Sequence, residues 1–230
     1  MNQELIQAIS IVCTILCFII ALVFHEVAHG FMAYKLGDPT AKRAGRLSLN
    51  PIKHIDPFGT IILPVCLMLM NCPVFGYAKP VPYNPTYFKD IRKGDFLVGI
   101  AGPLANLLIA LIATGFYYLL GLYTEGIQVA NATSFDYFLV IFRGQFLLQL
   151  VLLNLVFMFF NLLPIPPLDG SSVIALFIPT QHLPKWYQLQ RWALPIFMIL
   201  VIIVPYVIHI NPVTMYINAT AGNLFNLLIQ

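Results

Sequence analysis

The feature that most restricts the fold of this chain is a run of apolar residues near its first residue, from Leu5 to Phe24. Only Gln7, Ser10 and Thr14 interrupt the run with polar side chains. A helix of about 20 apolar residues is long enough to cross the hydrocarbon core of a bilayer. A helix also satisfies its own backbone hydrogen bonds, which lipid cannot do. The run therefore predicts a membrane-spanning helix over about residues 5–34.

The composition extends this prediction to the whole chain. Of its 230 residues, 60% are hydrophobic and only 9% are charged, whereas a soluble domain carries about 25% charged residues. We therefore expect one all-α polytopic membrane domain over residues 1–230, with four to six transmembrane helices. Its core would cover about residues 5–180, and additional C-terminal helices about 192–230. The net charge of +3 is modest and no long basic tract occurs, so we expect the lipid bilayer as a partner and no nucleic acid.

Further apolar runs predict membrane spans over about residues 96–122, 145–162 and 192–210, and an interfacial helix over 213–230. The polar connection between the second and third spans would run from residue 123 to residue 136. After the first helix we expect a short membrane-associated β-hairpin or a re-entrant loop. The segments that would build it are a short strand at 44–51, a broken span at 58–70 and an extended proline-rich stretch at 71–85.

The lysines and arginines are distributed unevenly along the chain. Of the twelve, nine lie between the first and second predicted spans, and only Arg143 lies near the opposite side. Basic residues are enriched in cytoplasmic loops, so we expect an outside N-terminus and a cytoplasmic 35–93 region. The compartment would be the cytoplasmic (inner) membrane if the source is prokaryotic. At roughly 1.5 Å per residue, His25 then lies about 30 Å from Leu5, near the cytoplasmic side.

The sequence His25-Glu26-Val27-Ala28-His29 stands at the end of the first apolar run. Residues four apart lie on one face of a helix, so the two imidazoles can bind a single metal ion. This H-E-x-x-H pattern is typical of zinc hydrolases, in which the glutamate takes a proton from water. The alternative is that the three polar groups cluster for packing alone. Ionisable residues inside a spanning helix are costly, and this favours the functional interpretation.

A catalytic zinc site needs a third protein ligand, and Asp169 is the best candidate. It is the only carboxylate between Asp136 and residue 230, and it follows a helix end broken by prolines, at the predicted depth of His25. An alternative role for Asp169 is to cap a helix that begins at Ser171. His54 could also approach the site, although an interfacial structural role is favoured for it. We expect His182 to be solvated, and His209 lies at the outer end of the last span.

These residues also carry a resemblance. Three stretches are similar to motifs of the site-2 protease family of intramembrane zinc metalloproteases: His25-Glu26-Val27-Ala28-His29-Gly30, Gly102-Pro103-Leu104-Ala105-Asn106, and Asn161-Leu162-Leu163-Pro164-Ile165-Pro166-Pro167-Leu168-Asp169-Gly170. The resemblance covers roughly residues 15–180 and is to the short form without a PDZ domain. It implies one zinc ion bound by His25, His29 and Asp169, with Glu26 as the catalytic acid and base. It also implies that Asn161 is a polar group near the scissile carbonyl.

The expected function is an intramembrane zinc metalloendopeptidase. It would cleave the transmembrane segments of membrane proteins with a single spanning helix, near the cytoplasmic face, by metal-activated water. A spanning helix must unwind before it is attacked, and a strand-like edge at 46–50, or at 77–85, could bind the unwound segment.

Alternatives to these roles stay open. A membrane metal-handling or transport protein could use the same ligands, although they gather at one depth, and a catalytically idle partner of a membrane complex would not need Glu26. Asn161 could instead bond to backbone freed by the Pro164 break. For Asn106 we expect a packing or helix–helix hydrogen-bonding role.

Overall fold

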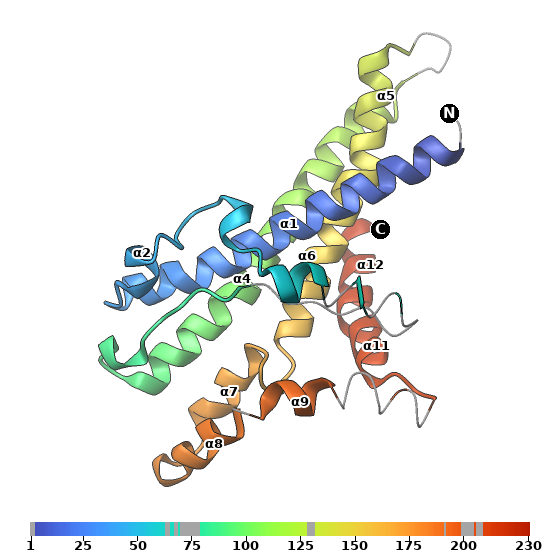
Figure 1. Ribbon diagram of the computed structural model, residues 1–230. Helices are drawn as coiled ribbons and strands as arrows, with labels where there is room; N and C mark the ends of the chain where they lie inside the picture. Colours follow the sequence, from blue (N-terminus) through green and yellow to red (C-terminus); the bar gives the residue numbers. More distant parts are fainter. Residues whose placement is uncertain are drawn as a thin grey trace.

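The computed structural model of this chain is built from helices (Figure 1). It describes residues 3–62, 65, 66, 69, 79–127, 132–190, 192–198, 205 and 209–230. Within these residues, three helices are long and apolar enough to span a membrane: α1 (Gln3–Lys35), α4 (Ile91–Thr124) and the helix Ser134–Asn161. The third joins α5 (Ser134–Ile141), the π-helical η5 (Phe142–Leu147) and α6 (Leu148–Asn161). The prediction of a helical membrane protein is confirmed. The total of four to six spans stays a prediction, because much of the expected span at 192–210 lies outside the described residues.

Two of the spanning helices begin earlier than their apolar runs predict, because polar side chains cap them. The Asp90 side chain accepts hydrogen bonds from the amides of Arg92 and Lys93, and α4 starts directly after it. Thr133 and Asp136 form a capping box at the start of α5, in which each side chain bonds to the other residue's backbone. The prediction that residues 134–136 belong to a polar connection is therefore wrong.

The core of the bundle lies where α4 packs against both α1 and α6. Cys17 of α1, Ala110 of α4 and Val151 and Leu155 of α6 are fully buried in one apolar cluster. Small side chains on α4 allow this close approach, as is common between membrane helices. A small residue of α4 also allows close packing nearer to the histidines. A Cβ on Gly99 would overlap the hydroxyl of Ser172, so the glycine lets the helix over Gly170–Phe177 pack directly on α4.

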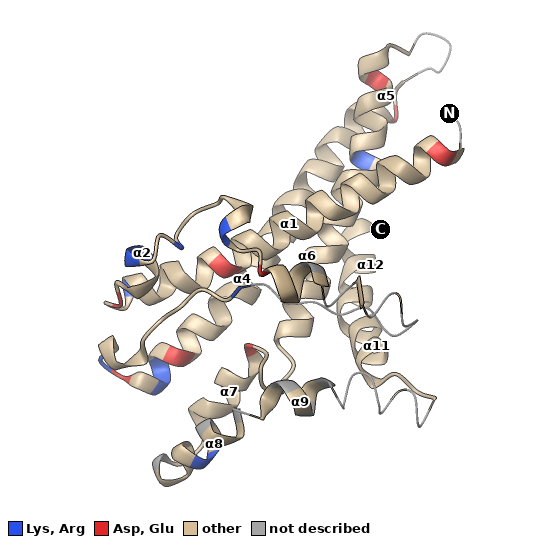
Figure 2. Ribbon diagram, in the orientation of Figure 1, with Lys and Arg blue, Asp and Glu red and all other residues tan. Residues whose placement is uncertain are grey.

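The charged residues lie mostly at one end of this bundle (Figure 2). They surround α2 (Thr40–Arg43) and the ends of α1 and α4 that lie next to it, while the middle of each long helix is nearly free of charge. With its 33 residues α1 is about 50 Å long, which exceeds a hydrocarbon core of about 30 Å. One of its ends must therefore project from the bilayer, or the helix must tilt.

The connection from α1 to α4 contains α2 and three short helical turns, η1 (Pro51–Lys53), η2 (Pro57–Ile62) and η3 (Pro85–Tyr87). The described residues of this connection, 36–62, 65, 66, 69 and 79–90, contain no strand. The short strand expected at 44–51 is therefore not found. Residues 63–64, 67–68 and 70 of the expected broken span, and residues 71–78 of the extended proline-rich stretch, lie outside the described residues.

After α6 the chain turns through residues 162–169 into α7 (Gly170–Phe177), η6 (Thr180–His182), α8 (Leu183–Gln190) and α9 (Ala193–Met198). The C-terminal helix is formed by α11 (Pro212–Ile217), η8 (Asn218–Gly222) and α12 (Asn223–Ile229). It packs along α6, and Ala221 is fully buried in the apolar cluster. The helix expected at 213–230 therefore exists and contributes to the bundle core, and its place along the membrane interface stays a prediction.

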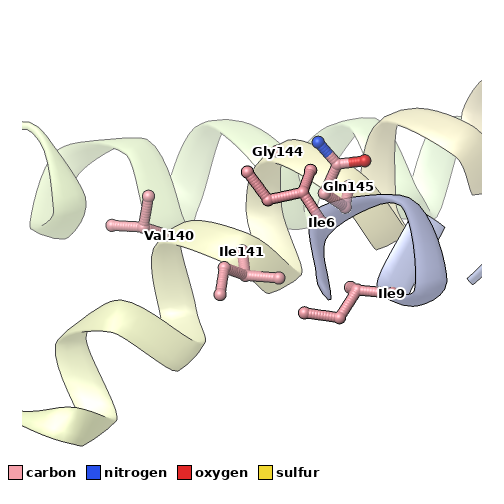
Figure 3. A pocket seen from close by; sticks show the side chains of 6 residues that line it. All are labelled: Ile6, Ile9, Val140, Ile141, Gly144 and Gln145. Atoms are coloured by element: carbon pink, nitrogen blue, oxygen red, sulfur yellow. The ribbon is translucent and has the colours of Figure 1, made fainter. Parts of the chain in front are cut away.

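An apolar groove of about 250 Å³ lies between the first turns of α1 and the helix formed by α5 and η5 (Figure 3). Its lining residues are Ile6, Ile9, Val140, Ile141, Gly144 and Gln145. From Ile9 to His25 the chain rises about 24 Å along α1. The groove is therefore remote from the predicted site, and it has none of the polar groups that hydrolysis needs.

Candidate metal centre

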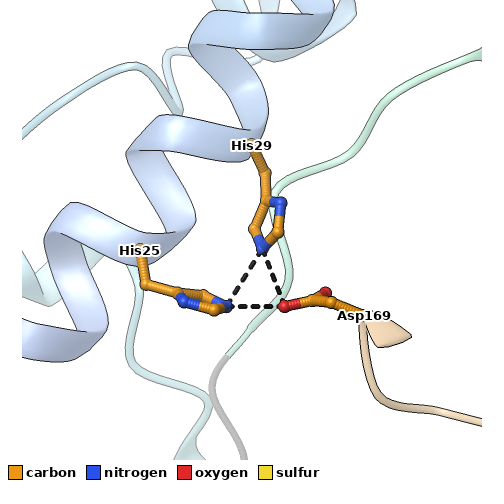
Figure 4. A group of neighbouring side chains, drawn as sticks. All are labelled: His25, His29 and Asp169. Atoms are coloured by element: carbon orange, nitrogen blue, oxygen red, sulfur yellow. Dashed lines mark hydrogen bonds and ion pairs between the residues drawn. The ribbon is translucent and has the colours of Figure 1, made fainter. Parts of the chain in front are cut away.

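Three side chains from two distant parts of the chain meet at the predicted site (Figure 4). The Nε2 atoms of His25 and His29 are 3.0 Å apart. Oδ2 of Asp169 lies 3.0 Å from the first of these nitrogens and 3.3 Å from the second. Both histidines are buried, and the aspartate, which directly precedes α7, is half-buried. The structure thus brings together all three residues that we predicted as metal ligands.

The hydrogen bonds of the imidazoles show that the converging atoms are acceptors. Nδ1 of His29 lies 2.7 Å from the carbonyl oxygen of Val98, which can only accept, so this nitrogen carries the proton. Nδ1 of His25 lies 2.6 Å from Oδ1 of Asn106 and likewise donates. In a neutral imidazole the other nitrogen then holds a lone pair. Two such lone pairs and a carboxylate oxygen face each other, an arrangement that a shared cation stabilises and that zinc ligation requires.

Asp169 occupies the N-cap position of α7, but its side chain makes no capping hydrogen bond. Its Oδ2 is buried and has no hydrogen-bond donor among the described residues. The ionised form of a carboxyl is the one that binds metals. The side chain is therefore placed as a ligand would be, and its alternative role as a helix cap is not realised.

The G-P-x-x-N stretch of α4 packs directly against the imidazoles of His25 and His29. A Cβ on Gly102 would overlap Nε2 of His29 and would lie 2.6 Å from Cε1 of His25. One turn later, Asn106 bonds to His25 and also donates to the carbonyl of Ala21, 3.1 Å away. The glycine therefore makes room for the two rings, and the asparagine orients one of them. Our expectation of a helix–helix hydrogen bond for Asn106 is confirmed.

Asn154 is a residue of this site that sequence reasoning missed. It is fully buried on α6, its Oδ1 accepts a 2.8 Å hydrogen bond from Nδ2 of Asn106, and its own amide donates to Leu150. A polar residue inside a strongly apolar run is the signal that could have marked it. Through this chain of amides, α6 supports the orientation of His25 on α1.

Glu26 lies one residue beyond His25 and is half-buried. Its Oε2 accepts a 2.9 Å hydrogen bond from the backbone N–H of Val81. The segment around Val81 has no regular secondary structure, and it is bound to the rest of the connection by Arg46, whose guanidinium donates to the carbonyls of Lys79 and Pro80. The sequence did not indicate any of these contacts.

The remaining predicted residues have mixed outcomes. Asn161 is at the last position of α6, where its side-chain amide donates a 3.0 Å hydrogen bond to the carbonyl of Phe157. Its role at the scissile carbonyl stays a prediction. His54 is fully buried, and its Nε2 bonds to the carbonyl of Ser48 at 2.7 Å, which fits a structural role. The side chains of His182 and His209 are exposed.

A buried pair of histidines and an aspartate, beside the glutamate of an H-E-x-x-H helix in an apolar helical bundle, defines a membrane metalloprotease. Comparisons with known proteins agree with this class. The model of "Peptidase family M50" matches residues 13–204. The chain therefore belongs to peptidase family M50, which is the site-2 protease family, and it is a zinc metalloprotease.

Several curated proteins are similar to this chain over most of its length. "Putative zinc metalloprotease YwhC" of Bacillus subtilis is 41% identical over 188 residues, which cover 81% of this chain and 78% of the relative. "Putative zinc metalloprotease Rip2" of Mycolicibacterium smegmatis is 30% identical over 185 residues, 80% of this chain and 64% of the relative. "Putative zinc metalloprotease MJ0611" of Methanocaldococcus jannaschii is 29% identical over 170 residues, 70% of this chain and 72% of the relative. No solved structure matches.

Proposed function

We propose that this protein is an intramembrane zinc endopeptidase that cleaves the spanning segments of membrane proteins, and that it uses one ion held by His25, His29 and Asp169. The observation that carries the proposal is the convergence of three acceptor atoms within 3.0–3.3 Å of one another, with Glu26 adjacent. The nitrogen and oxygen donors suit zinc, which binds two histidines and a carboxylate in other hydrolases.

A bound zinc ion supplies Lewis acidity, which makes water acidic enough to react near neutral pH and polarises a carbonyl. The protein side chains supply the proton transfers. Glu26 takes a proton from the attacking water as the water adds to the scissile carbonyl carbon. It then gives the proton to the leaving amide nitrogen as the C–N bond breaks. This sequence of transfers leaves Glu26 ionised again after each turnover.

Asn161 is our candidate for a donor to the oxygen of the scissile carbonyl. It ends α6, eight positions before Asp169, on the turn that leads to the proposed ligand. Its amide is engaged with the Phe157 carbonyl, so a rotation of the side chain would have to accompany substrate binding. A donor of this kind is typically worth about 100- to 1000-fold in kcat.

We propose an outside N-terminus and an active site near the cytoplasmic face. This orientation is supported by the concentration of lysines and arginines between α1 and α4 (Figure 2) and by the enrichment of such residues in cytoplasmic loops. The substrates would be proteins with a single spanning helix, because such a helix is not packed in a bundle of other spanning helices and can unwind more easily than one that is.

The unwound substrate would bind along the irregular segment 46–50 by pairing its extended backbone with the backbone of this segment. The segment lies against the catalytic helix, since a Cβ on Gly30 would be 2.8 Å from Cδ2 of Leu47. Within the described part of the chain, the backbone groups of Leu47 and Leu49 have no hydrogen-bond partner. An extended substrate could pair with these groups. A Leu47→Pro variant that still cleaved helical substrates at the wild-type rate would contradict this role.

A metal transporter with the same three ligands is the alternative. It would need a polar path toward the outer face, but the bundle beyond His25 is filled by the apolar cluster around Cys17, Ala110 and Leu155. This packing favours hydrolysis over transport.

The test is a comparison of the wild-type protein with Glu26→Gln, each co-expressed with single-span membrane proteins. We expect wild-type cells to contain cleaved products and the variant to accumulate intact substrates while it still binds zinc. Cleavage that continues in Glu26→Gln would contradict the proposed function. Zinc flux into proteoliposomes that survives in this variant, without proteolysis by the wild type, would support the transporter.

A further inference from the structure

Val81 supplies the only backbone N–H between Lys79 and Tyr83, because Pro80 and Pro82 have none. This N–H donates to Oε2 of Glu26 at 2.9 Å. We propose that the Val81 N–H is a positioning group, which holds the Glu26 carboxylate in the orientation that proton transfer needs. The inference rests on the proposed function and deepens it, since it concerns how the catalytic carboxylate is oriented.

The hydrogen bond divides the two oxygens of Glu26 between two tasks. Oε2 is fixed by the amide, in a bond that is strengthened by the negative charge of its acceptor. Oε1 has no hydrogen-bond partner within the residues that the structure describes. A glutamate has several rotatable bonds, and in a half-buried position it would otherwise sample several rotamers. With Oε2 fixed, Oε1 is the atom that accepts the proton from water.

The segment that carries Val81 is held on both sides, which makes the amide a rigid donor. On the N-terminal side Arg46 donates to the carbonyls of Lys79 and Pro80, the latter at 3.2 Å. The Lys79 amide donates to the carbonyl of His54 at 3.0 Å. On the C-terminal side, the Asn84 amide donates to the fully buried Asp38.

Local stereochemistry adds to this rigidity. The proline that follows Val81 restricts it to an extended conformation. Its side chain is only 6% exposed and faces α1 at Gly30, where a Cβ would lie 2.7 Å from Cγ1 of Val81. Gly30, which directly follows the H-E-x-x-H motif, therefore lets the segment approach α1 closely enough for the Val81 amide to contact Glu26.

The decisive comparison is between Val81→Pro and Val81→Ala in the full chain. Val81→Pro removes the N–H and suits an extended segment that already has prolines on both sides, whereas Val81→Ala keeps the N–H and removes only the packing. The purified, zinc-loaded proteins would be assayed with fluorescein-labelled casein, an unfolded polypeptide that needs no unwinding. We expect Val81→Pro to lose about 10- to 100-fold in kcat, with KM and zinc content unchanged. We expect Val81→Ala, which keeps the N–H, to lose much less activity than Val81→Pro.

Three outcomes would overturn the inference. The first is an equal kcat for Val81→Pro and Val81→Ala. The second is a loss of zinc from Val81→Pro that accounts for its lost activity. The third is a higher activity of Val81→Pro than of the wild type, which would show that the segment around Val81 inhibits the site. The proposed function is judged separately in the same assay. Its protease activity with Glu26 as the base stands if the wild type cleaves casein and Glu26→Gln does not, whatever the two Val81 variants show.

Hydrogen–deuterium exchange provides a measurement that needs no turnover and no proline variant. The peptide over residues 79–84 would be followed in the wild type, in Glu26→Gln, whose amide oxygen can still accept, and in Glu26→Ala, which has no acceptor. We expect one amide of this peptide to exchange faster in Glu26→Ala only. Unchanged exchange in Glu26→Ala would show that the hydrogen bond does not form, and would overturn the inference even if Val81→Pro failed to fold.

Discussion

His25 and Asn106 are 81 positions apart in the sequence, yet the imidazole of the first donates a 2.6 Å hydrogen bond to the side-chain oxygen of the second. The asparagine is itself held by Ala21 and Asn154. The direction in which His25 presents its other nitrogen is therefore set by α4 and α6 together with its own helix, α1. A metal centre built in this way depends on the relative positions of three spanning helices.

Replacing Asn106 should weaken zinc binding without unfolding the bundle. Asn106→Leu removes the acceptor for Nδ1 of His25, and the loss of such a partner lowers metal affinity by about 10- to 100-fold. Asn106→Asp keeps an acceptor at the same position and should lose less. Competition with a chromophoric chelator in detergent would measure both affinities. Equal affinities for the wild type and Asn106→Leu would show that the hydrogen bond does not orient the ligand.

Gly102 should tolerate no side chain, although it lies in a regular helix. In Gly102→Ala the new methyl group would overlap the imidazole of His29 and crowd that of His25, so both rings must move away from the site. Gly115→Ala is the matched control, because a Cβ on this glycine of the same helix meets nothing within 4 Å. We expect zinc to be lost from the first variant only, as measured by metal analysis of the purified proteins. The control should be as stable as the wild type or slightly more stable.

Asn161 has two interpretations that kinetics can separate. If its amide stabilises the developing oxyanion, Asn161→Ala should lower kcat by about 100-fold or more and leave the zinc affinity unchanged. If the amide only bonds to the Phe157 carbonyl, the same variant should lose thermal stability and keep its kcat. Cleavage of labelled casein and thermal unfolding of the same preparations would distinguish the two.

The metal ligands could be predicted from the sequence because the information for each of them is local. The four-residue spacing of His25 and His29 places both rings on one helix face. Ionisable residues are costly in such apolar surroundings, and this indicates that the face has a function. The sequence predicted Asp169 as a ligand on weaker grounds. It follows a proline-broken helix end at the predicted depth of the histidines, and the motif resemblance strengthened the assignment.

The supporting contacts could not be predicted in this way. Whether Asn154 faces Asn106 depends on the rotation of α6 about its axis, and in a lipid-exposed helix the apolar pattern does not set that rotation, because the lipid-facing and core-facing sides are both apolar. The bond from Val81 to Glu26 comes from a backbone N–H, which leaves no trace in the pattern of side chains. The early starts of α4 and α5 were missed for a different reason. The caps at Asp90 and Thr133 are local signals, but the apolar runs begin well inside the helices that these residues start.

Thermal unfolding with and without zinc should distinguish a metal ligand, such as Asp169, from the proposed catalytic base, Glu26. A ligand that binds only the folded state stabilises it, by about 2.7 kcal/mol when its concentration is about 100 times Kd. Chelation should therefore lower the Tm of the wild type, and added zinc should restore it. Glu26→Gln should respond to zinc as the wild type does, because Glu26 is not a ligand. Asp169→Asn removes the charge that completes the site and should show almost no response. If Asp169→Asn were stabilised by zinc as strongly as Glu26→Gln, the ion would be bound without the aspartate, and the three-ligand centre would be wrong.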